Sequence, residues 1–138
     1  MKTLKKILCL LAAVAIAMAV LGCGKKEQAQ PTASGKDITV QLSIDGSAGN
    51  EKYDVNFSGK TSVPEGATAY DALKAVCDSN GFEIEGEPSY VTGIGGLGEG
   101  SFGSNCGWMY MVNGDYAFCS ADEYALSAGD DVVWIFMK

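Results

Sequence analysis

The chain has 138 residues, 17 of them acidic and ten basic, and its formal net charge at pH 7 is −7. It contains neither histidine nor arginine, so the commonest general base, the commonest metal ligand and the bidentate anion clamp are missing. All 17 acidic residues but only seven of the ten lysines follow Cys23, which leaves that part with a formal charge of −10. Because such a surface repels nucleic acid, we expect no nucleic-acid partner.

Residues 1–22 have the organisation of a lipoprotein signal peptide. Three lysines precede an apolar run at residues 7–21, and its length of about 15 residues suits a signal sequence better than a membrane span. The run ends in Val20-Leu21-Gly22-Cys23, which resembles the lipobox of bacterial lipoproteins. We therefore predict a lipid on Cys23 that holds the protein at the extracytoplasmic face of the cell membrane. An ordinary signal peptide that happens to contain Cys23 is the alternative.

The next segment separates the anchor from the domain. Residues 24–35 contain no large apolar side chain, so this stretch cannot bury enough surface to offset the entropy lost on ordering. We predict that residues 23–35, lipidated Cys23 included, form a flexible linker and that residues 36–138 form one domain.

Apolar and polar residues alternate in several later segments, which predicts strands with one buried face. The first two are expected at residues 38–44 and 53–57. Thr68 with Asp71 resembles a capping box and Asn80-Gly81 a helix stop, so one helix of about three turns is predicted between them. Further short strands are expected at residues 82–84, 90–94, 107–112, 116–119 and 132–137. This pattern predicts a small α+β domain with a β-grasp-like fold, in which one helix crosses a mixed sheet.

The positions of the cysteines in these predicted elements indicate which of them can form a disulfide. Asn113-Gly114 is a strong signal for a type I′ hairpin turn. A turn there places Trp108 opposite Cys119 and makes Cys106 a diagonal neighbour of Cys119 on the adjacent strand. We predict a disulfide between Cys106 and Cys119, worth about 3 kcal/mol in the chain-entropy model. Cys77 is left over and is expected to be a buried thiol on the apolar face of the helix.

A glycine-rich stretch runs from residue 93 to residue 103 and matches the G-x-G-x-x-G template of dinucleotide sites. That template requires a helix directly after it, and no helical period follows here, so we reject a nucleotide site. The stretch is either a flexible loop or a backbone that a flat ligand approaches closely. Three aromatic residues lie near it in the sequence, and the predicted ligand site therefore consists of Gly95, Gly96, Phe102, Trp108 and Tyr116.

Catalysis finds little support in the sequence. The adjacent acids Asp122-Glu123 and Asp130-Asp131 lack the alternating spacing of a calcium loop. Neighbouring residues on a strand also point to opposite faces, which separates paired carboxylates. Cys77 has no histidine to activate it. We expect neither an enzyme nor a bound cofactor or metal.

Four segments resemble the transcobalamin-like C-terminal domain family. They are GWMYMVNG at residues 107–114, YALSAGDDVVW at 124–134, VPEGATAYDAL at 63–73 and YVTGI at 90–94. In the animal cobalamin carriers of this family, the domain is the small β-rich half that closes over cobalamin against a helical barrel. The resemblance therefore implies a β-rich domain whose ligand is cobalamin or a related corrinoid.

Two functions remain open. The first is a lipid-anchored, non-catalytic domain that binds a flat, partly apolar small molecule such as a corrinoid. The second is a module for surface protein–protein interaction or adhesion with no small-molecule ligand. An exposed Trp108 and Phe102 beside a concave glycine loop would favour the first, and a flat, exposed strand edge would favour the second.

Overall fold

The computed structural model describes residues 35–138, so the predicted signal peptide, the lipidated Cys23 and nearly all of the predicted linker lie outside the described residues. The elements are β1 (Asp37–Asp45), a 3₁₀ helix η1 (Ser47–Gly49), β2 (Asn56–Pro64), α2 (Ala69–Asn80), β3 (Ile84–Glu87), β4 (Tyr90–Ile94), β5 (Leu97–Gly98), β6 (Gly107–Val112), β7 (Asp115–Tyr116) and β8 (Asp131–Met137). In this part of the chain, no helix is long and apolar enough to span a membrane.

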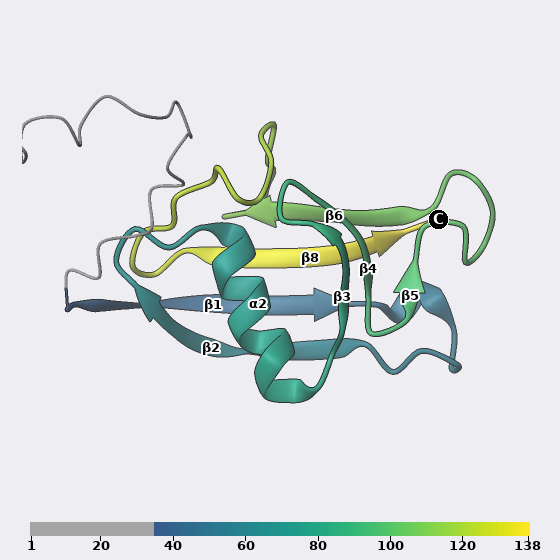
Figure 1. Ribbon diagram of the computed structural model, residues 1–138, viewed down its shortest axis with the longest axis horizontal. Helices are drawn as coiled ribbons and strands as arrows, with labels where there is room; N and C mark the ends of the chain where they lie inside the picture. The colour runs from purple at the N-terminus through teal and green to yellow at the C-terminus, as the bar shows by residue number, and fades with distance from the viewer. Residues whose placement is uncertain (1–34) are drawn as a thin grey trace, which may run out of the picture. The chain divides into compact units, whose positions relative to one another are not determined.

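The strands form two sheets. The larger one has five strands in the order β2-β1-β8-β6-β7, and the smaller one has the order β3-β4-β5. The central pair β1–β8 is parallel, whereas the other pairs are antiparallel. Helix α2 crosses one face of the large sheet, beside β3 and β4 (Figure 1). The predicted mixed sheet with one helix is confirmed, and the finer β-grasp-like description stays a prediction.

The core lies between the large sheet and the elements that cover the face crossed by α2. Along β1, Ile38, Val40, Leu42 and Ile44 are each at most 7% exposed, and the residues between them are not buried. Helix α2 contributes the buried side chains of Ala69, Ala72, Leu73, Val76 and Cys77. Since burying one large aliphatic side chain is worth about 1.5–3 kcal/mol, the alternation in β1 suffices to decide which face of the strand points inward.

The ends of α2 follow the sequence prediction. The Asp71 N–H donates to Thr68 Oγ1 at 3.2 Å, and the Thr68 N–H donates to Asp71 Oδ2 at 2.9 Å, which completes a capping box. Gly81 ends the helix at φ 73°, in the left-handed region that favours glycine. The sequence thus predicted both the position and the length of this helix correctly.

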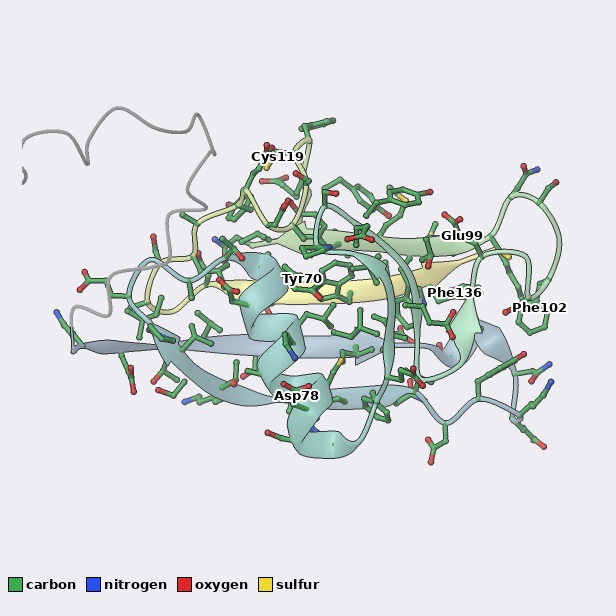
Figure 2. All side chains as sticks on the ribbon, in the orientation of Figure 1. Tyr70, Asp78, Glu99, Phe102, Cys119 and Phe136 are labelled. Atoms are coloured by element: carbon green, nitrogen blue, oxygen red, sulfur yellow. The ribbon has the colours of Figure 1, made fainter. Side chains whose placement is uncertain are left out.

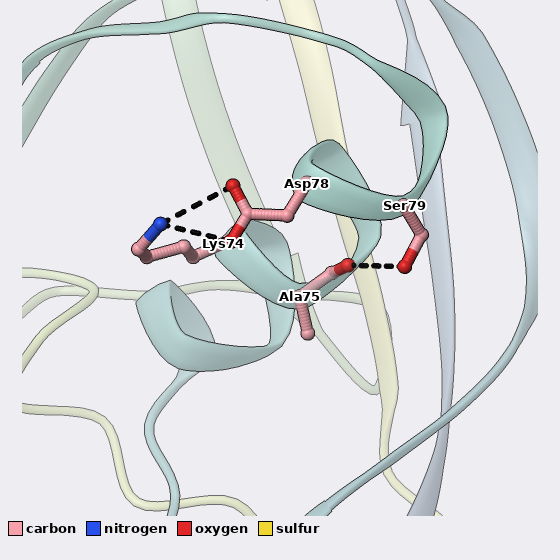
Figure 3. A network of polar contacts seen from close by, with 4 residues as sticks. All are labelled: Lys74, Ala75, Asp78 and Ser79. Atoms are coloured by element: carbon pink, nitrogen blue, oxygen red, sulfur yellow. Dashed lines mark hydrogen bonds and ion pairs between the residues drawn. The ribbon is translucent and has the colours of Figure 1, made fainter.

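The exposed face of α2 carries polar contacts one turn apart. Lys74 Nζ lies 2.9 Å from Asp78 Oδ2, and Ser79 Oγ donates to the carbonyl oxygen of Ala75 at 2.9 Å (Figure 3). The hydrogen bond to Asp78 raises the pKa of Lys74. Because both side chains of this pair are exposed, the pair marks the solvent side of the helix and contributes little to its stability.

Three strand predictions need correction. The strand predicted at residues 82–84 is β3, which begins at Ile84 and ends at Glu87. The second strand spans Asn56–Pro64 instead of residues 53–57, because the chain pairs with β1 only from Asn56 onward. The strand predicted at residues 116–119 is the two-residue β7, which ends at Tyr116. The hairpin turn itself is confirmed: Val112 pairs with Asp115, Met111 pairs with Tyr116, and Asn113 and Gly114 have φ 55° and 87°.

Candidate functional site

A groove of about 470 Å³ runs beside β6. We call it the β6 groove; it is lined by residues 88–91, 99, 104–110, 117, 119–121, 134 and 137. Its walls come from the β3–β4 turn, the chain between β5 and β6, and the loop that follows β7. Figure 2 shows Cys119 near the end of β6 and Glu99 towards its start. The groove therefore joins segments that are far apart in the sequence.

Aromatic rings form the floor of the β6 groove. Tyr110 stacks on Trp134 with ring centroids 5.1 Å apart and planes inclined by 24°. Trp108 packs edge-on against Phe136 at 5.4 Å, and its Nε1 donates to the carbonyl oxygen of Leu97 at 2.7 Å. Strand pairing explains this arrangement, because Trp108 lies opposite Phe136 and Tyr110 opposite Trp134 on the core face. The floor consequently consists of packed aromatic rings and is largely apolar.

Trp134 brings an unpaired donor to this floor. Its side chain is 3% exposed, and its Nε1 has no hydrogen-bond partner in the described part of the chain. Leaving a buried N–H unpaired costs about 1–3 kcal/mol. Trp108, the other tryptophan of the groove, has its donor satisfied.

One carboxylate stands at the rim. Glu99 is the single charged side chain among the lining residues, and it accepts a hydrogen bond from the Tyr90 hydroxyl. This bond, together with the negative charge of Glu99, raises the pKa of Tyr90. Tyr90 is 63% exposed, so its ring is available to a bound molecule. The groove thus offers aromatic surface and one negative charge.

Two cysteines line the groove as free thiols, and the structure holds no Cys106–Cys119 disulfide. Cys106 is buried, and its thiol donates to the carbonyl oxygen of Gly103 at 3.1 Å. The Cys119 carbonyl instead accepts a 2.7 Å hydrogen bond from the Tyr110 hydroxyl. The predicted register does not extend to Cys119 because β7 ends early. Cys119 lies against the Tyr110 hydroxyl instead, with its Sγ 3.7 Å from that oxygen.

The structure places the five predicted ligand-site residues in different surroundings. Trp108 alone is among those that line the β6 groove. Phe102 packs edge-on against Tyr53 and Phe136, with Lys138 Nζ 5.0 Å from its ring centre. Tyr116 lies in β7 and is 43% exposed. Phe102 and Trp108 thus both pack against Phe136, whereas no ring contact of Tyr116 with either is present among the described residues. The role of these aromatics in binding stays a prediction.

Gly95 and Gly96 form the tight β4–β5 turn, with φ 59° and 81°. A Cβ on Gly95 would lie 2.7 Å from Val55 Cγ2, so close packing also excludes a side chain there. The glycine-rich stretch is thus folded into a hairpin, and packing and turn geometry account for these two glycines.

Sequence reasoning missed Tyr90, Glu99, Tyr110 and Trp134 as groove residues. They come from the start of β4, the segment after β5, and strands β6 and β8. The alternation of residues 132–137 puts Trp134 on a buried face, but it does not say which strand lies next to it. Strand pairing supplies that information.

Comparison with known proteins identifies the family. The model described as "Domain of unknown function (DUF4430)" matches residues 66–138, more than half of the chain. The chain belongs to the DUF4430 family. This match covers α2 and all strands from β3 to β8, and so includes every residue that lines the β6 groove. No curated protein matches the sequence.

The solved structures that are similar to this DUF4430 chain include the following two. Haptocorrin, in complex with Cbi, has a TM-score of 0.60 and 20% sequence identity over 75% of this chain and 25% of that one. The chain thus spans about a quarter of the length of haptocorrin, and the similarity shows a shared fold. A protein from Ruminococcus gnavus ATCC 29149 described as metal binding has a TM-score of 0.44 and 18% identity over 75% of this chain and 97% of that one.

Proposed function

We propose that this DUF4430 protein is a lipid-anchored, extracytoplasmic binding protein that captures a flat, partly apolar small molecule in the β6 groove. A corrinoid is the ligand we favour. The observation that carries this proposal is the groove of about 470 Å³ with its floor of aromatic rings. The fold is shared with part of haptocorrin, which was solved in complex with Cbi. Small-molecule sites commonly have volumes of ~300–1,000 Å³ and mostly apolar walls with a few polar groups.

The chemistry of the groove supports an uncharged or cationic ligand. Its one charged lining residue is Glu99, and its floor consists of the Trp108, Tyr110 and Trp134 rings. A flat ligand would lie against the exposed Tyr90 ring and exchange hydrogen bonds with serine and asparagine side chains at residues 89, 104, 105 and 120. No acid pair lies in the groove, so we assign binding and no reaction.

Calorimetric titration with cobalamin and with incomplete corrinoid precursors tests this function. We expect saturable binding at micromolar affinity or better, which Tyr90→Ala weakens by about tenfold, or ~1.4 kcal/mol. Tyr116→Ala distinguishes the groove from the ligand site predicted from the sequence, because Tyr116 is also an exposed tyrosine but does not line the groove. Absence of heat at high micromolar concentration would refute the corrinoid ligand. If Tyr116→Ala weakens binding and Tyr90→Ala does not, the site lies elsewhere.

The anchor is tested separately. Expression with a radiolabelled fatty acid should label the wild-type protein and leave Cys23→Ser unlabelled. Equal labelling of both proteins would contradict lipidation at Cys23. The result is independent of the ligand experiment, because it concerns residues outside the domain.

A further inference from the structure

Strand β6 has an open backbone edge inside the β6 groove. β8 pairs with all six residues from Gly107 to Val112, whereas β7 pairs only with Met111 and Val112. The last backbone hydrogen bond on the β7 side goes from the Ala117 N–H to the carbonyl oxygen of Tyr110, at 3.3 Å. The first half of β6 is therefore hydrogen-bonded to a neighbouring strand on one side only.

Strand geometry says which groups are exposed there. In an antiparallel ladder, the N–H and C=O of one residue face the same neighbour, and successive residues face alternate sides. Tyr110 faces β7, so Trp108, two residues earlier, faces the same side, where β7 no longer runs. Within residues 35–138, no backbone hydrogen bond of Trp108 to another segment is recorded on this side. Its N–H and C=O are thus offered to the groove.

The two edges of the large sheet differ in their protection. The β2 edge has Lys60 at its centre and Pro64 at its end, and both residue types discourage the addition of another strand. β6 has no charged residue and no proline between Gly107 and Val112. The β6 edge is therefore the one that is chemically open to strand addition.

The negative charge of Glu99 beside this edge favours a partner with a basic side chain. The Glu99 side chain lies against the start of β6, since a Cβ on Gly107 would be 3.4 Å from Glu99 Cγ. The exposed Tyr90 ring stands next to this carboxylate and hydrogen-bonds to it. A lysine or arginine side chain would find both a counter-ion and an aromatic face here. The acidic character of the whole chain favours the same kind of partner.

We propose that the β6 groove also binds an extended peptide segment of a partner protein, which adds a strand at Trp108 and places a lysine or arginine side chain against Glu99 and Tyr90. Main-chain hydrogen bonds to Trp108 supply the pairing, and the carboxylate supplies the charge preference. This proposal of peptide binding does not depend on the corrinoid ligand, although the peptide and the corrinoid would compete for the same groove.

The test uses the full-length protein purified in detergent and displayed nine-residue peptides. One library carries a fixed central lysine, and a control library carries a fixed central glutamate. We expect binders from the lysine library alone. Glu99→Gln, which keeps an acceptor for Tyr90, should weaken them about two- to fivefold. Glu51→Gln, an exposed glutamate outside the groove, is the matched control and should have no effect.

Two further experiments test directly whether the peptide pairs with the β6 backbone. N-methyl groups at alternate positions of a selected peptide should abolish binding in one register and leave it nearly unchanged in the other. Hydrogen exchange should be fast at the Trp108 N–H in the free protein and slow in the complex, whereas the Met109 N–H, which faces β8, is protected in both. Strand addition is refuted if neither library yields a binder, if N-methylation has no register dependence, or if Trp108 is already protected. Binding of cobalamin without any peptide binding would refute this inference and leave the proposed function intact.

Discussion

Tyr110 and Trp134 stack across the β6–β8 pair, with ring centroids 5.1 Å apart, and the two rings differ in how their polar groups are satisfied. The Tyr110 hydroxyl donates to the Cys119 carbonyl, whereas the Trp134 Nε1 has no partner within residues 35–138. One ring of the pair therefore holds the loop after β7 in place. The other carries an unpaired donor into the floor of the groove.

The two tryptophans of the groove should respond differently to replacement by phenylalanine. Trp134→Phe removes an N–H that is buried without a partner, so part of the cost of the smaller ring is offset. Trp108→Phe removes the donor to the Leu97 carbonyl and leaves that acceptor unpaired. We expect Trp108→Phe to be more destabilising than Trp134→Phe by about 1–3 kcal/mol. Urea unfolding of both variants measures this, and equal losses of stability would contradict the assigned difference in hydrogen bonding.

Tyr110→Phe should loosen the loop after β7. The variant keeps the ring stacked on Trp134 but loses the bond to the Cys119 carbonyl, for a cost of about 0.5–1.5 kcal/mol. Phe118, which is fully exposed in this loop, should then be cleaved faster by chymotrypsin. Tyr124→Phe is the control, since no hydrogen bond of the Tyr124 hydroxyl is recorded among the described residues. Unchanged cleavage in Tyr110→Phe would show that the loop is held by other contacts.

The cysteines should react with a thiol reagent in a defined order. Cys119 is exposed, whereas Cys106 and Cys77 are buried. In reduced protein we expect one fast-reacting thiol, lost in Cys119→Ser, and two that react only on unfolding. Intact mass before and after reduction of the isolated protein then shows whether a Cys106–Cys119 bond forms during export. A loss of mass by two hydrogens in the unreduced protein would require the loop after β7 to shift towards Cys106.

Burial of Cys77 should make the domain less stable in alkali. Desolvation raises the pKa of this thiol from 9.0 to about 11. Between these values the unfolded chain loses the thiol proton while the folded chain keeps it, so the free energy of unfolding decreases as pH rises from about 9 to 11. Below pH 9 the thiol is protonated in both states and has no such effect.

The Cys77→Ala variant isolates this contribution. It removes the titrating thiol, so its unfolding free energy should fall less steeply between pH 9 and 11 than that of the wild type. The variant also loses packing, which lowers its stability at all pH values and does not change the slope. Urea titrations at several pH values compare the slopes, and identical slopes would mean that Cys77 ionises equally in both states.

Local patterns in the sequence were sufficient for several elements. The capping box of Thr68 and Asp71, the stop at Gly81 and the Asn113-Gly114 turn all rest on contacts within a few residues, and the structure confirms each of them. The alternation along β1 likewise predicted its buried face. The end of β7 was predicted wrongly, because it depends on the loop that turns back against Tyr110.

By itself, the sequence determined the helix and the longer strands in their order, the inward faces of α2 and β1, and a formal negative charge, since these follow from residue spacing and composition. Only the tertiary structure decided the candidate site. It brought Tyr90, Glu99, Tyr110 and Trp134 together from four segments and left the Trp108 backbone at an open edge. The physical reason is strand pairing: hydrogen bonds between distant segments set which side chains meet, and no local pattern carries that register.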